Sequence, residues 1–335
     1  MIKKIQLINF RNFKKNTFTF SDKVTVIVGP NGVGKTNILE SLFLLSTGKS
    51  FKAKLEEEMI NHDQVFARVL GRTEENKLET ILTKDSYKKK LLVNGISRRM
   101  IDFSGNLKIV LFGPWDMDLV TESPSLRRKF LDIVLSQVDR EYRRAILSYE
   151  KGLRQRNRLL FRIREEGLSR GQLLFWDKLL IKNGDYISTK RDEFIAFANG
   201  NPSINDQSFE LQYDKSAISE SRLEQYKDEE VAAATTLVGP HRDDFVFKMN
   251  KRALASFGSR GEQRMAILWL KLIELSFIQE KTLEKPTLLL DDIFSELDHK
   301  HRNIVVKVSK NQQTIITTAN PHFVEKIKDV LRIDL

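Results

Sequence analysis

The order of hydrophobic and polar positions predicts strands toward both ends of the chain and helices in its middle. Ile2–Phe10 alternates with the two-residue period of a half-buried strand. Val24–Val28 is β-branched and uncharged, which is typical of a buried parallel strand. An amphipathic helix is expected after Thr36, and residues 65–99 predict short antiparallel strands. Asn94-Gly95 predicts a tight hairpin there, because both residues tolerate the positive φ of a type I′ turn.

A long helical stretch is expected in the middle of the chain. Ser123-Pro124 predicts a helix start with proline in the first helical position, and apolar residues then recur near helical spacing to about Asn199. A further helix is expected from Ser259 onward. Further strands are expected at Ile109–Phe112, Phe209–Tyr213, Thr235–Val238, Phe245–Met249, Thr287–Leu290 and Thr314–Thr317.

Length and pattern together predict an α/β chain with two parts. A single core stops growing at roughly 250–300 residues, and this chain has 335. We therefore expect an α/β head built from residues 1–118 and 236–335, with a mainly helical lobe inserted at residues 119–235. The sequence contains no heptad run long enough for a long coiled coil.

Composition narrows the class of protein. The net charge is +11, an excess that favours polyanions such as nucleic acid or an anionic membrane surface. The absence of cysteine excludes disulfides and thiolate zinc sites, and the five scattered histidines argue against a histidine-rich metal site. No run approaches the roughly 20 apolar residues of a membrane span, and the N-terminus lacks the apolar stretch of a signal peptide. We expect a cytoplasmic protein without a membrane partner.

The strongest chemical signal is Gly29-x-x-x-x-Gly34-Lys35-Thr36, a phosphate-binding loop between a predicted strand and a predicted helix. Its backbone N–H groups are expected to point at a phosphate chain, and glycine permits the tight path. The helix N-terminus adds a favourable dipole. Lys35 is expected to reach the β- and γ-phosphates of ATP, and the Thr36 hydroxyl is expected to ligate Mg²⁺.

A pair of acids follows the apolar run at residues 287–290. Asp291, at the end of a predicted buried strand, can hold Mg²⁺ beside the phosphates. Asp292 is placed to orient or deprotonate the attacking water, so Asp292 and Lys35 are the candidate catalytic residues. Adjacent acids at a strand end also occur as helix N-caps, but the phosphate-binding loop favours the magnesium site.

A third motif separates the subclasses of phosphate-loop protein. Ser259-x-Gly261-x-Gln263 opens a helix and, with Glu262, offers a second anion site. The phosphate-binding loop already surrounds its own nucleotide, so this second site should serve a nucleotide on another subunit. We expect two chains to enclose two ATP molecules, with Asp298 in a loop that crosses the same interface. The alternative is an ordinary serine N-cap.

These motifs resemble the ATP-binding-cassette (ABC) heads of the structural-maintenance-of-chromosomes and Rad50-like type, and more closely the RecF family of bacterial recombination mediators. The resemblance rests on blocks that span nearly the whole chain: Gly29–Glu40, Thr47–Phe51, Ser123–Asp132, Leu153–Asn157, Thr236–Asp244 and Leu288–Asp298. It implies a Rad50-like head, called lobe I, with an inserted helical lobe II. It also implies an ATP-induced homodimer that binds DNA and hydrolyses ATP slowly with Mg²⁺.

The resemblance further implies partners and a nucleotide-binding set. Members of this family act in DNA replication, recombinational repair and the damage response. With RecO and RecR they help load the RecA recombinase onto gapped DNA. The implied nucleotide-binding residues are Arg11, Asn12, Gly29, Pro30, Asn31, Gly32, Val33, Gly34, Lys35, Thr36 and Asn37.

The chain departs from the wider ABC pattern in three places. Asp292 replaces the usual glutamate, as it does in the RecF family. Thr317–Asn320 stands where a switch histidine is expected, and Gly113–Asp116 stands where a Q-loop glutamine is expected.

Positive charge concentrates in the predicted helical lobe. Part of this arginine stripe is expected to contact DNA phosphates without reading bases. The candidate DNA-binding residues are Arg127, Arg128, Arg143, Arg144, Arg154, Arg156 and Arg158. The alternative is that these arginines solvate a helix face or bridge carboxylates one turn away.

Three other functions stay open from the sequence. A transporter ATPase subunit would need a membrane partner, a switch histidine and a Q-loop glutamine. A phosphate-loop phosphotransferase would need an acceptor pocket and gives no reason for Ser259–Gln263. A head fragment of a nuclease complex would carry coiled-coil arms.

Overall fold

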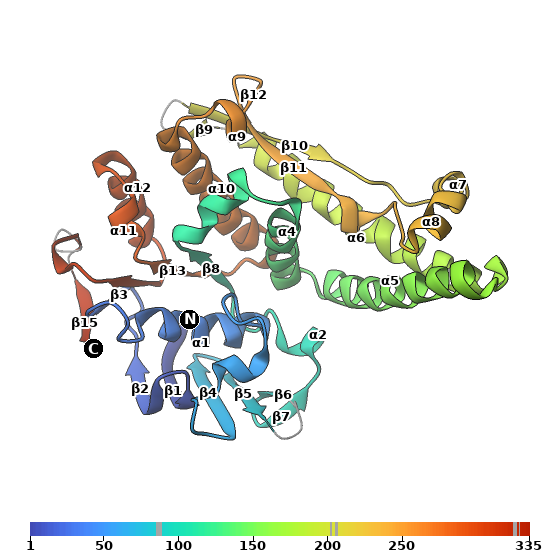
Figure 1. Ribbon diagram of the computed structural model, residues 1–335. Helices are drawn as coiled ribbons and strands as arrows, with labels where there is room; N and C mark the ends of the chain where they lie inside the picture. Colours follow the sequence, from blue (N-terminus) through green and yellow to red (C-terminus); the bar gives the residue numbers. More distant parts are fainter. Residues whose placement is uncertain (85–88, 202, 205–206, 324–326, 328) are drawn as a thin grey trace. The chain divides into compact units, whose positions relative to one another are not determined.

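The computed structural model describes residues 1–84, 89–201, 203–204, 207–323, 327 and 329–335 of the chain. These residues form two compact units (Figure 1). Met1–Met117 and Leu270–Leu335 make up the first unit, and Asp118–Trp269 makes up the second. Among the described residues, no helix is long and apolar enough to cross a membrane.

The first unit is built on a parallel sheet in the strand order β15-β3-β14-β13-β8. Its strands are β3 (Val24–Val28), β8 (Ile109–Phe112), β13 (Thr287–Asp291), β14 (Thr314–Thr318) and β15 (Val330–Asp334). Every residue of β3, β8, β13 and β14 is buried, so their sequences do not alternate between apolar and polar residues, and the one charged residue among them is Asp291 at the end of β13. Strands from both ends of the chain therefore share one sheet.

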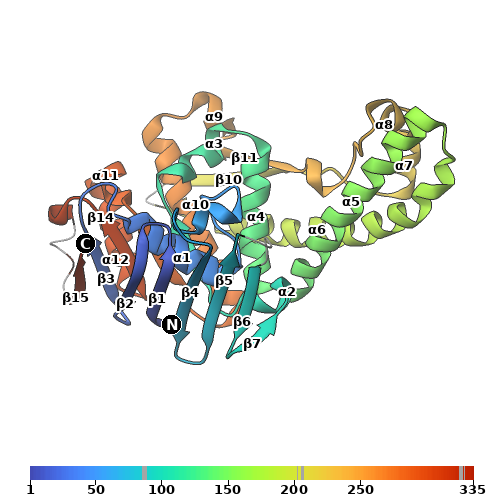
Figure 2. The same cartoon turned by 60° about the horizontal axis from the view of Figure 1, so that its bottom comes forward.

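An antiparallel sheet in the order β2-β1-β4-β5-β6-β7 completes the first unit (Figure 2). Its strands are β1 (Ile2–Phe10), β2 (Phe13–Thr19), β4 (Phe66–Thr73), β5 (Lys77–Thr83), β6 (Lys89–Val93) and β7 (Ile96–Arg98). The φ angles of Asn94 and Gly95 are 54° and 81°, which confirms the tight hairpin between β6 and β7.

Helix α1 (Lys35–Thr47) packs against strands of both sheets. The prediction of an amphipathic helix is therefore wrong: α1 is buried on nearly all sides, because apolar surface covers it from two directions. The remaining elements of this unit are η1 (Glu56–Met59), α2 (Met100–Phe103), η2 (Pro114–Met117), α11 (Ile293–Glu296), α12 (His299–Ser309) and η5 (Pro321–Phe323).

The second unit contains a long hairpin in which α5 (Arg140–Glu166) and α6 (Leu174–Gly200) run side by side (Figures 1 and 2). The predicted helix start is confirmed, because α4 (Pro124–Val138) begins at the proline. Its other helices are α3 (Asp118–Thr121), η3 (Arg170–Leu173), α7 (Glu220–Gln225), α8 (Lys227–Ala233), η4 (Pro240–Arg242) and α9 (Leu254–Phe257). The boundary between the units lies within α10 (Arg260–Thr282).

A small sheet in the order β12-β11-β10-β9 belongs to the second unit. Its strands are β9 (Ser203–Ile204), β10 (Gln207–Asp214), β11 (Asp244–Met249) and β12 (Arg252–Ala253). Because β11 pairs with β10 along its whole length, residues 236–269 group with the second unit and not with the head, where we had expected them.

The segment Thr235–Val238 is irregular, so the strand predicted there is wrong. Side chains, not a neighbouring strand, accept from two of its backbone N–H groups. The Thr236 N–H donates to Asn157 Oδ1 at 2.9 Å, and the Leu237 N–H donates to Glu230 Oε1 at 2.9 Å. Both acceptors come from helices that sequence pattern alone could not place beside this segment.

Candidate nucleotide-binding site

The phosphate-binding loop connects β3 to α1 and is held from outside by the turn after β1. Asn12 Nδ2 donates to the Val33 carbonyl at 2.8 Å, and Asn37 Nδ2 donates to Asn12 Oδ1 at 2.9 Å. Gly34 has a φ of 115°, and a Cβ there would lie 2.7 Å from Asn12 Nδ2. Glycine is therefore required at this position by both backbone conformation and space.

Lys35 places a cation inside the curve of the loop. Its ammonium donates to the carbonyls of Gly29 and Pro30, at 2.7 and 3.0 Å. These contacts hold Nζ at the mouth of the loop, where a phosphate chain would meet both the ammonium and the N-terminus of α1.

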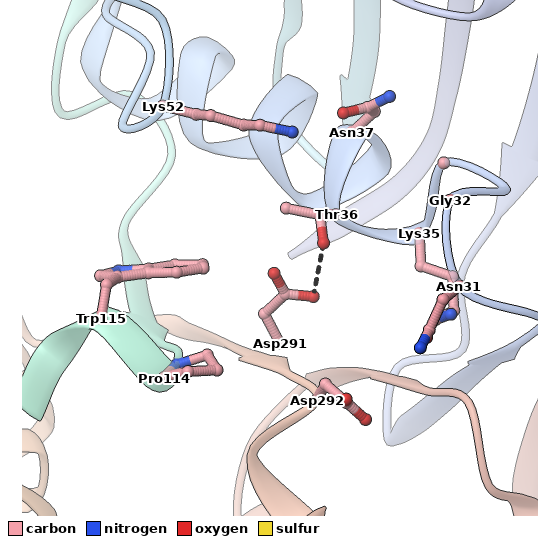
Figure 3. Close-up of a pocket in the computed structure, with 11 residues that line it drawn as sticks. Asn31, Gly32, Lys35, Thr36, Asn37, Lys52, Pro114, Trp115, Asp291 and Asp292 are labelled. Atoms are coloured by element: carbon pink, nitrogen blue, oxygen red, sulfur yellow. Dashed lines mark hydrogen bonds between the residues drawn. The ribbon is translucent and has the colours of Figure 1, made fainter.

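Asp291 ends β13 and meets two hydroxyls. Its Oδ1 accepts from Thr36 Oγ1 at 3.1 Å (Figure 3). The same oxygen accepts from Thr317 Oγ1 at 2.6 Å. Burial raises the pKa of the Asp291 carboxyl, and the two hydroxyl donors oppose that rise. The carboxylate and the Thr36 hydroxyl are hard oxygen ligands at the phosphate-binding loop, so this donor set fits Mg²⁺ bound together with nucleotide phosphates.

Thr317 was missed as a site residue by sequence reasoning. It lies at the end of β14 in register with Asp291, because β13 and β14 are parallel neighbours. The carboxyl ends of parallel strands meet at one edge of a sheet, and this rule was the signal that could have found it.

Asp292 holds a strained backbone conformation next to the pocket. Its φ is 49°, in the left-handed region that is rare for residues other than glycine. Its N–H donates to the Thr317 carbonyl and hydroxyl oxygens, each at 3.1 Å. Such strain concentrates at functional sites, where the surrounding structure fixes a side chain in one direction.

Residues of the phosphate-binding loop, the start of α1, the end of β13 and the turn after β8 line one pocket of about 410 Å³. The close-up in Figure 3 shows Thr36 and Asp291 between the loop on one side and Trp115 on the other. The lining residues are Asn31, Gly32, Gly34, Lys35, Thr36, Asn37, Lys52, Pro114, Trp115, Asp291 and Asp292. Lys52 and Trp115 were not predicted, although the segment around Trp115 was noted as standing in place of the Q-loop.

Arg11, one of the predicted nucleotide-binding residues, lies outside this lining. Its guanidinium donates twice to Glu40, at 2.7 and 2.6 Å, and also to the Glu58 carbonyl. Glu40 is fully buried, and a buried carboxylate needs such a partner.

The signature residues lie at the start of α10 in the second unit. The Ser259 N–H donates to Glu262 Oε2 at 2.7 Å, and the Glu262 N–H donates to Ser259 Oγ at 3.3 Å, which is a reciprocal capping box. Gln263 Nε2 donates to the Leu254 carbonyl at 3.0 Å. A Cβ on Gly261 would meet only Ser259 Oγ, at 4.0 Å. In the first unit, Asp298 caps α12 by accepting from the His301 N–H at 2.9 Å.

Two predicted DNA-binding arginines are buried, and those predictions are wrong. Arg156 is 1% exposed and binds Glu230 at 2.7 Å and Asp177 at 2.6 Å. Arg127 is 6% exposed and binds Asp244 at 2.6 Å. A guanidinium whose donors are taken inside the fold cannot reach a phosphate.

The other candidate DNA-binding arginines differ in exposure and in the partners of their guanidinium groups. Arg128 is half-buried and donates to the Asp243 carbonyl at 2.8 Å, and Arg143 donates to the Ser136 carbonyl. Arg144 is exposed and paired with Glu141. Arg154 and Arg158 are exposed on α5.

Comparison with known proteins places this site in a family. A family model described as the RecF/RecN/SMC N terminal domain matches residues 1–335. The DNA replication and repair protein RecF of Herpetosiphon aurantiacus is 34% identical, over 97% of this chain and 96% of that protein. The chain belongs to the RecF family. The RecF of Lachnoclostridium phytofermentans is also 34% identical, over 95% of this chain and 92% of that protein.

Solved structures of the RecF family share the fold. The structure of the recombination mediator protein RecF-ATPrS in the RecFOR pathway matches with a TM-score of 0.91 at 33% identity, covering 99% of this chain and 96% of that one. RecF-ATP from the same pathway matches with a TM-score of 0.89 at 33% identity, covering 95% and 92%. An SMC head bound to the C-winged helix domain of ScpA, at 17% identity, has a TM-score of 0.54 and covers 100% and 94%, which is a likeness of fold alone.

Proposed function

We propose that this chain is an ATP-dependent, DNA-binding ATPase that acts in DNA replication and recombinational repair. The observation that carries the proposal is the meeting of Thr36, Thr317 and Asp291 beside the Lys35 ammonium. This arrangement brings a carboxylate and two hydroxyls, the oxygen ligands that Mg²⁺ prefers, to a phosphate-binding loop. The RecF structures with ATP and ATPrS support the choice of nucleotide.

Each residue of the pocket has a distinct part in this proposal. Lys35 and the loop N–H groups bind and orient the phosphates, which is the larger share of catalysis in phosphoryl transfer. Thr36 and Asp291 would hold Mg²⁺, which neutralises charge on the phosphate oxygens. Asp292 orients the attacking water, and its strained backbone fixes the direction of its carboxylate.

ATP is proposed to join two copies of the chain. Ser259 and its neighbours form a helix N-terminus that favours an anion. They belong to the second unit, whereas the phosphate-binding loop of the same chain belongs to the first. Phe257, two residues before Ser259, is 73% exposed, as expected for a surface that a second copy covers. Asp298 is proposed to lie in the same dimer interface.

DNA is proposed to bind along the outer face of α5. Lys151, Arg154 and Arg158 recur at three- and four-residue spacing, opposite the buried positions of that helix. All three are exposed. Such a stripe binds phosphates without reading sequence, in keeping with a mediator that acts wherever DNA is gapped.

The partners follow from the same family. The related structures belong to the RecFOR pathway. We propose that this chain works with RecO- and RecR-type proteins in loading recombinase, in the cytoplasm where the bacterial chromosome lies.

The central experiment measures DNA binding by fluorescence anisotropy with ATP, with ADP and without nucleotide. Binding should require ATP in the wild type, and Lys35→Ala should abolish both nucleotide and DNA binding. Light scattering should show a dimer with ATP only, and Asp292→Asn should keep that dimer from dissociating. A protein that stays monomeric with saturating ATP would contradict the dimer, and ATP-independent DNA binding would contradict the coupling.

A charge-matched pair of variants tests the α5 face. Arg154→Gln should weaken DNA binding uniformly across sequences and lower the slope of log affinity against log salt by about 1. Arg72→Gln removes one charge from an exposed arginine of β4 and should leave that slope unchanged. Equal effects of both substitutions would mean that net charge, and not the α5 stripe, governs binding.

The rival functions predict different results. A transporter ATPase subunit would not retain DNA on ATP addition. A phosphotransferase would stay monomeric with ATP. The RecF relationship over nearly the full chain favours neither rival.

A further inference from the structure

One wall of the nucleotide pocket comes from the turn that follows β8. Because β8 and β13 are parallel neighbours with Phe112 opposite Leu290, the residues after both strands emerge at the same edge of the sheet. Pro114 and Trp115 therefore line the pocket together with Asp291 and Asp292. Figure 3 shows the indole of Trp115 facing the Thr36–Asp291 pair.

The Trp115 ring is held on two sides. It stacks on Phe51, with ring centroids 4.9 Å apart and planes 25° apart, and Phe51 packs edge-on against Phe43 of α1 at 5.4 Å. A Cβ added to Gly113 would lie 2.5 Å from Trp115 Cζ2, so the indole lies directly on the Gly113 backbone. The position of the indole thus depends on the path of this turn.

A buried ion pair fixes that path. Asp116 accepts from the Gly113 N–H at 2.8 Å through Oδ2, and its Oδ1 lies 3.0 Å from Lys271 Nζ. Lys271 is 5% exposed and also lies 3.1 Å from Glu274. Both belong to α10, the helix that the signature motif opens. Burying a charge carries a desolvation penalty. Closing a four-residue turn does not by itself require a buried lysine with two carboxylates, which indicates that this ion pair has a further role.

We propose that Asp116 and Lys271 are positioning residues of the ATPase, which hold the Pro114–Trp115 wall against the side of the pocket where Asp291 and Asp292 lie. This inference rests on the proposed ATPase function. The wall belongs to Gly113–Asp116, the segment that stands where a Q-loop glutamine is expected in ABC enzymes. A rigid aromatic surface, fixed by Lys271 of α10, therefore shapes this side of the pocket in place of that glutamine. The loop and Lys35 bind the phosphates without it, and the wall affects the hydrolytic step.

Glu274 and Asp116 are both partners of Lys271, but they have different roles. Burial raises the pKa of its carboxyl to about 7, with Asp116 adding to the rise and Lys271 opposing it. Those two are the charged groups that face it, Lys271 from its own helix and Asp116 from the turn after β8. Asp116 is the carboxylate that connects Lys271 to the wall, because it also accepts from the Gly113 N–H.

The test compares Asp116→Asn with Glu274→Gln. Each is isosteric and removes one carboxylate from Lys271, but only the first acts on the wall. In Asp116→Asn we expect kcat for ATP to fall about tenfold or more, because small misplacements at a reacting centre have effects of this size. The ATP dissociation constant should stay within about threefold, since the phosphate-binding loop is untouched. Glu274→Gln should keep both values near those of the wild type.

Trp115 supplies a readout that does not depend on hydrolysis. The emission difference between the wild type and Trp115→Phe isolates its signal from that of Trp176 and Trp269. In Asp116→Asn this signal should shift to the red and become more accessible to acrylamide, without nucleotide present. If Asp116→Asn does not fold, Gly113→Ala displaces the indole without altering any charge and should lower kcat in the same way.

The outcomes separate this inference from the proposed function. An unchanged Trp115 signal and an unchanged kcat in Asp116→Asn would overturn the positioning role. Equal losses in Asp116→Asn and Glu274→Gln would do the same, because they would make the network a general stabiliser of the core. A wild type that hydrolyses no ATP would refute the ATPase proposal, while the Trp115 spectra would still decide whether Asp116 positions the wall.

Discussion

The hydroxyl of Thr317 offers the sharpest test of the proposed magnesium site. Thr317→Val keeps the shape of a fully buried residue and removes the donor that lies 2.6 Å from Asp291 Oδ1. The remaining hydroxyl donor to that oxygen is Thr36, at 3.1 Å. Because the single O–H of Thr36 already donates to this oxygen, Thr36 cannot supply a second donor in place of Thr317.

The size of the effect follows from the charge of Asp291. Burial already raises the pKa of this carboxyl, and the Thr317 hydroxyl opposes the rise, so its loss should raise the pKa further. A hydrogen bond to a charged group contributes about 1.5–3 kcal/mol. With about 1.4 kcal/mol per decade, the Mg²⁺ concentration needed for half-maximal ATP binding should rise about 10- to 100-fold.

Isothermal titration of ATP over a series of Mg²⁺ concentrations measures this requirement. Thr318→Val is the matched control, because Thr318 is also fully buried on β14 but donates to the Asn320 carbonyl at 3.0 Å, away from Asp291. Each variant loses one buried hydroxyl that both donates and accepts hydrogen bonds, so the two should melt at similar temperatures without ligand. A Mg²⁺ requirement in Thr317→Val within twofold of that in Thr318→Val would refute the reasoning.

Further predictions concern stability and the loop. Burial lowers the pKa of His241 from 6.5 to about 4. Its contribution to the free energy of unfolding is therefore fully present above pH 6.5, and about 3 kcal/mol is lost as the pH falls toward 4. Urea unfolding of His241→Phe should show a flatter pH profile than that of the wild type. Arg156→Met leaves buried carboxylates unpaired and should lower the free energy of unfolding by about 3–5 kcal/mol, whereas Arg154→Met should change it by under about 0.5 kcal/mol; equal melting temperatures would contradict this. Gly34→Ala adds strain of about 1–3 kcal/mol at a φ of 115° and should lose ATP binding in a calorimetric titration while the far-ultraviolet circular dichroism stays unchanged.

The sequence was sufficient to find the parts of the site that lie next to one another along the chain. The phosphate-binding loop has its glycines, Lys35 and Thr36 in one stretch, and the strand before Asp291 is an unbroken apolar run. Parallel strands end at one edge of a sheet, so these two motifs were bound to meet once both strands were assigned to that sheet. The Thr36–Asp291 hydrogen bond confirms that they do.

Sequence pattern failed where a polar group finds its partner far along the chain. Arg156 lies in a helical run of arginines that looks like a solvated face, but Glu230 and Asp177 bury it. Arg156 is two residues from Arg154 and two from Arg158, so it lies on the opposite side of α5, the side that meets α6. That side is set by packing, which a single helix does not reveal.

The block at residues 236–244 shows how family membership and function can be carried by different parts of the chain. It was among the segments that carried the resemblance, and its residues resemble a site because they are charged and close together. The structure uses them to join three helices of the second unit: Asp244 binds Arg127 of α4, His241 hydrogen-bonds Tyr149 of α5, and Asp243 binds Arg191 of α6. Each of these partners is itself buried, and a buried ionic group is destabilising unless its partner is present. Such a cluster constrains one arrangement of helices and leaves few substitutions open, which makes it a marker of the fold, whereas the chemistry proposed for this protein belongs to the loop and strand ends of the first unit.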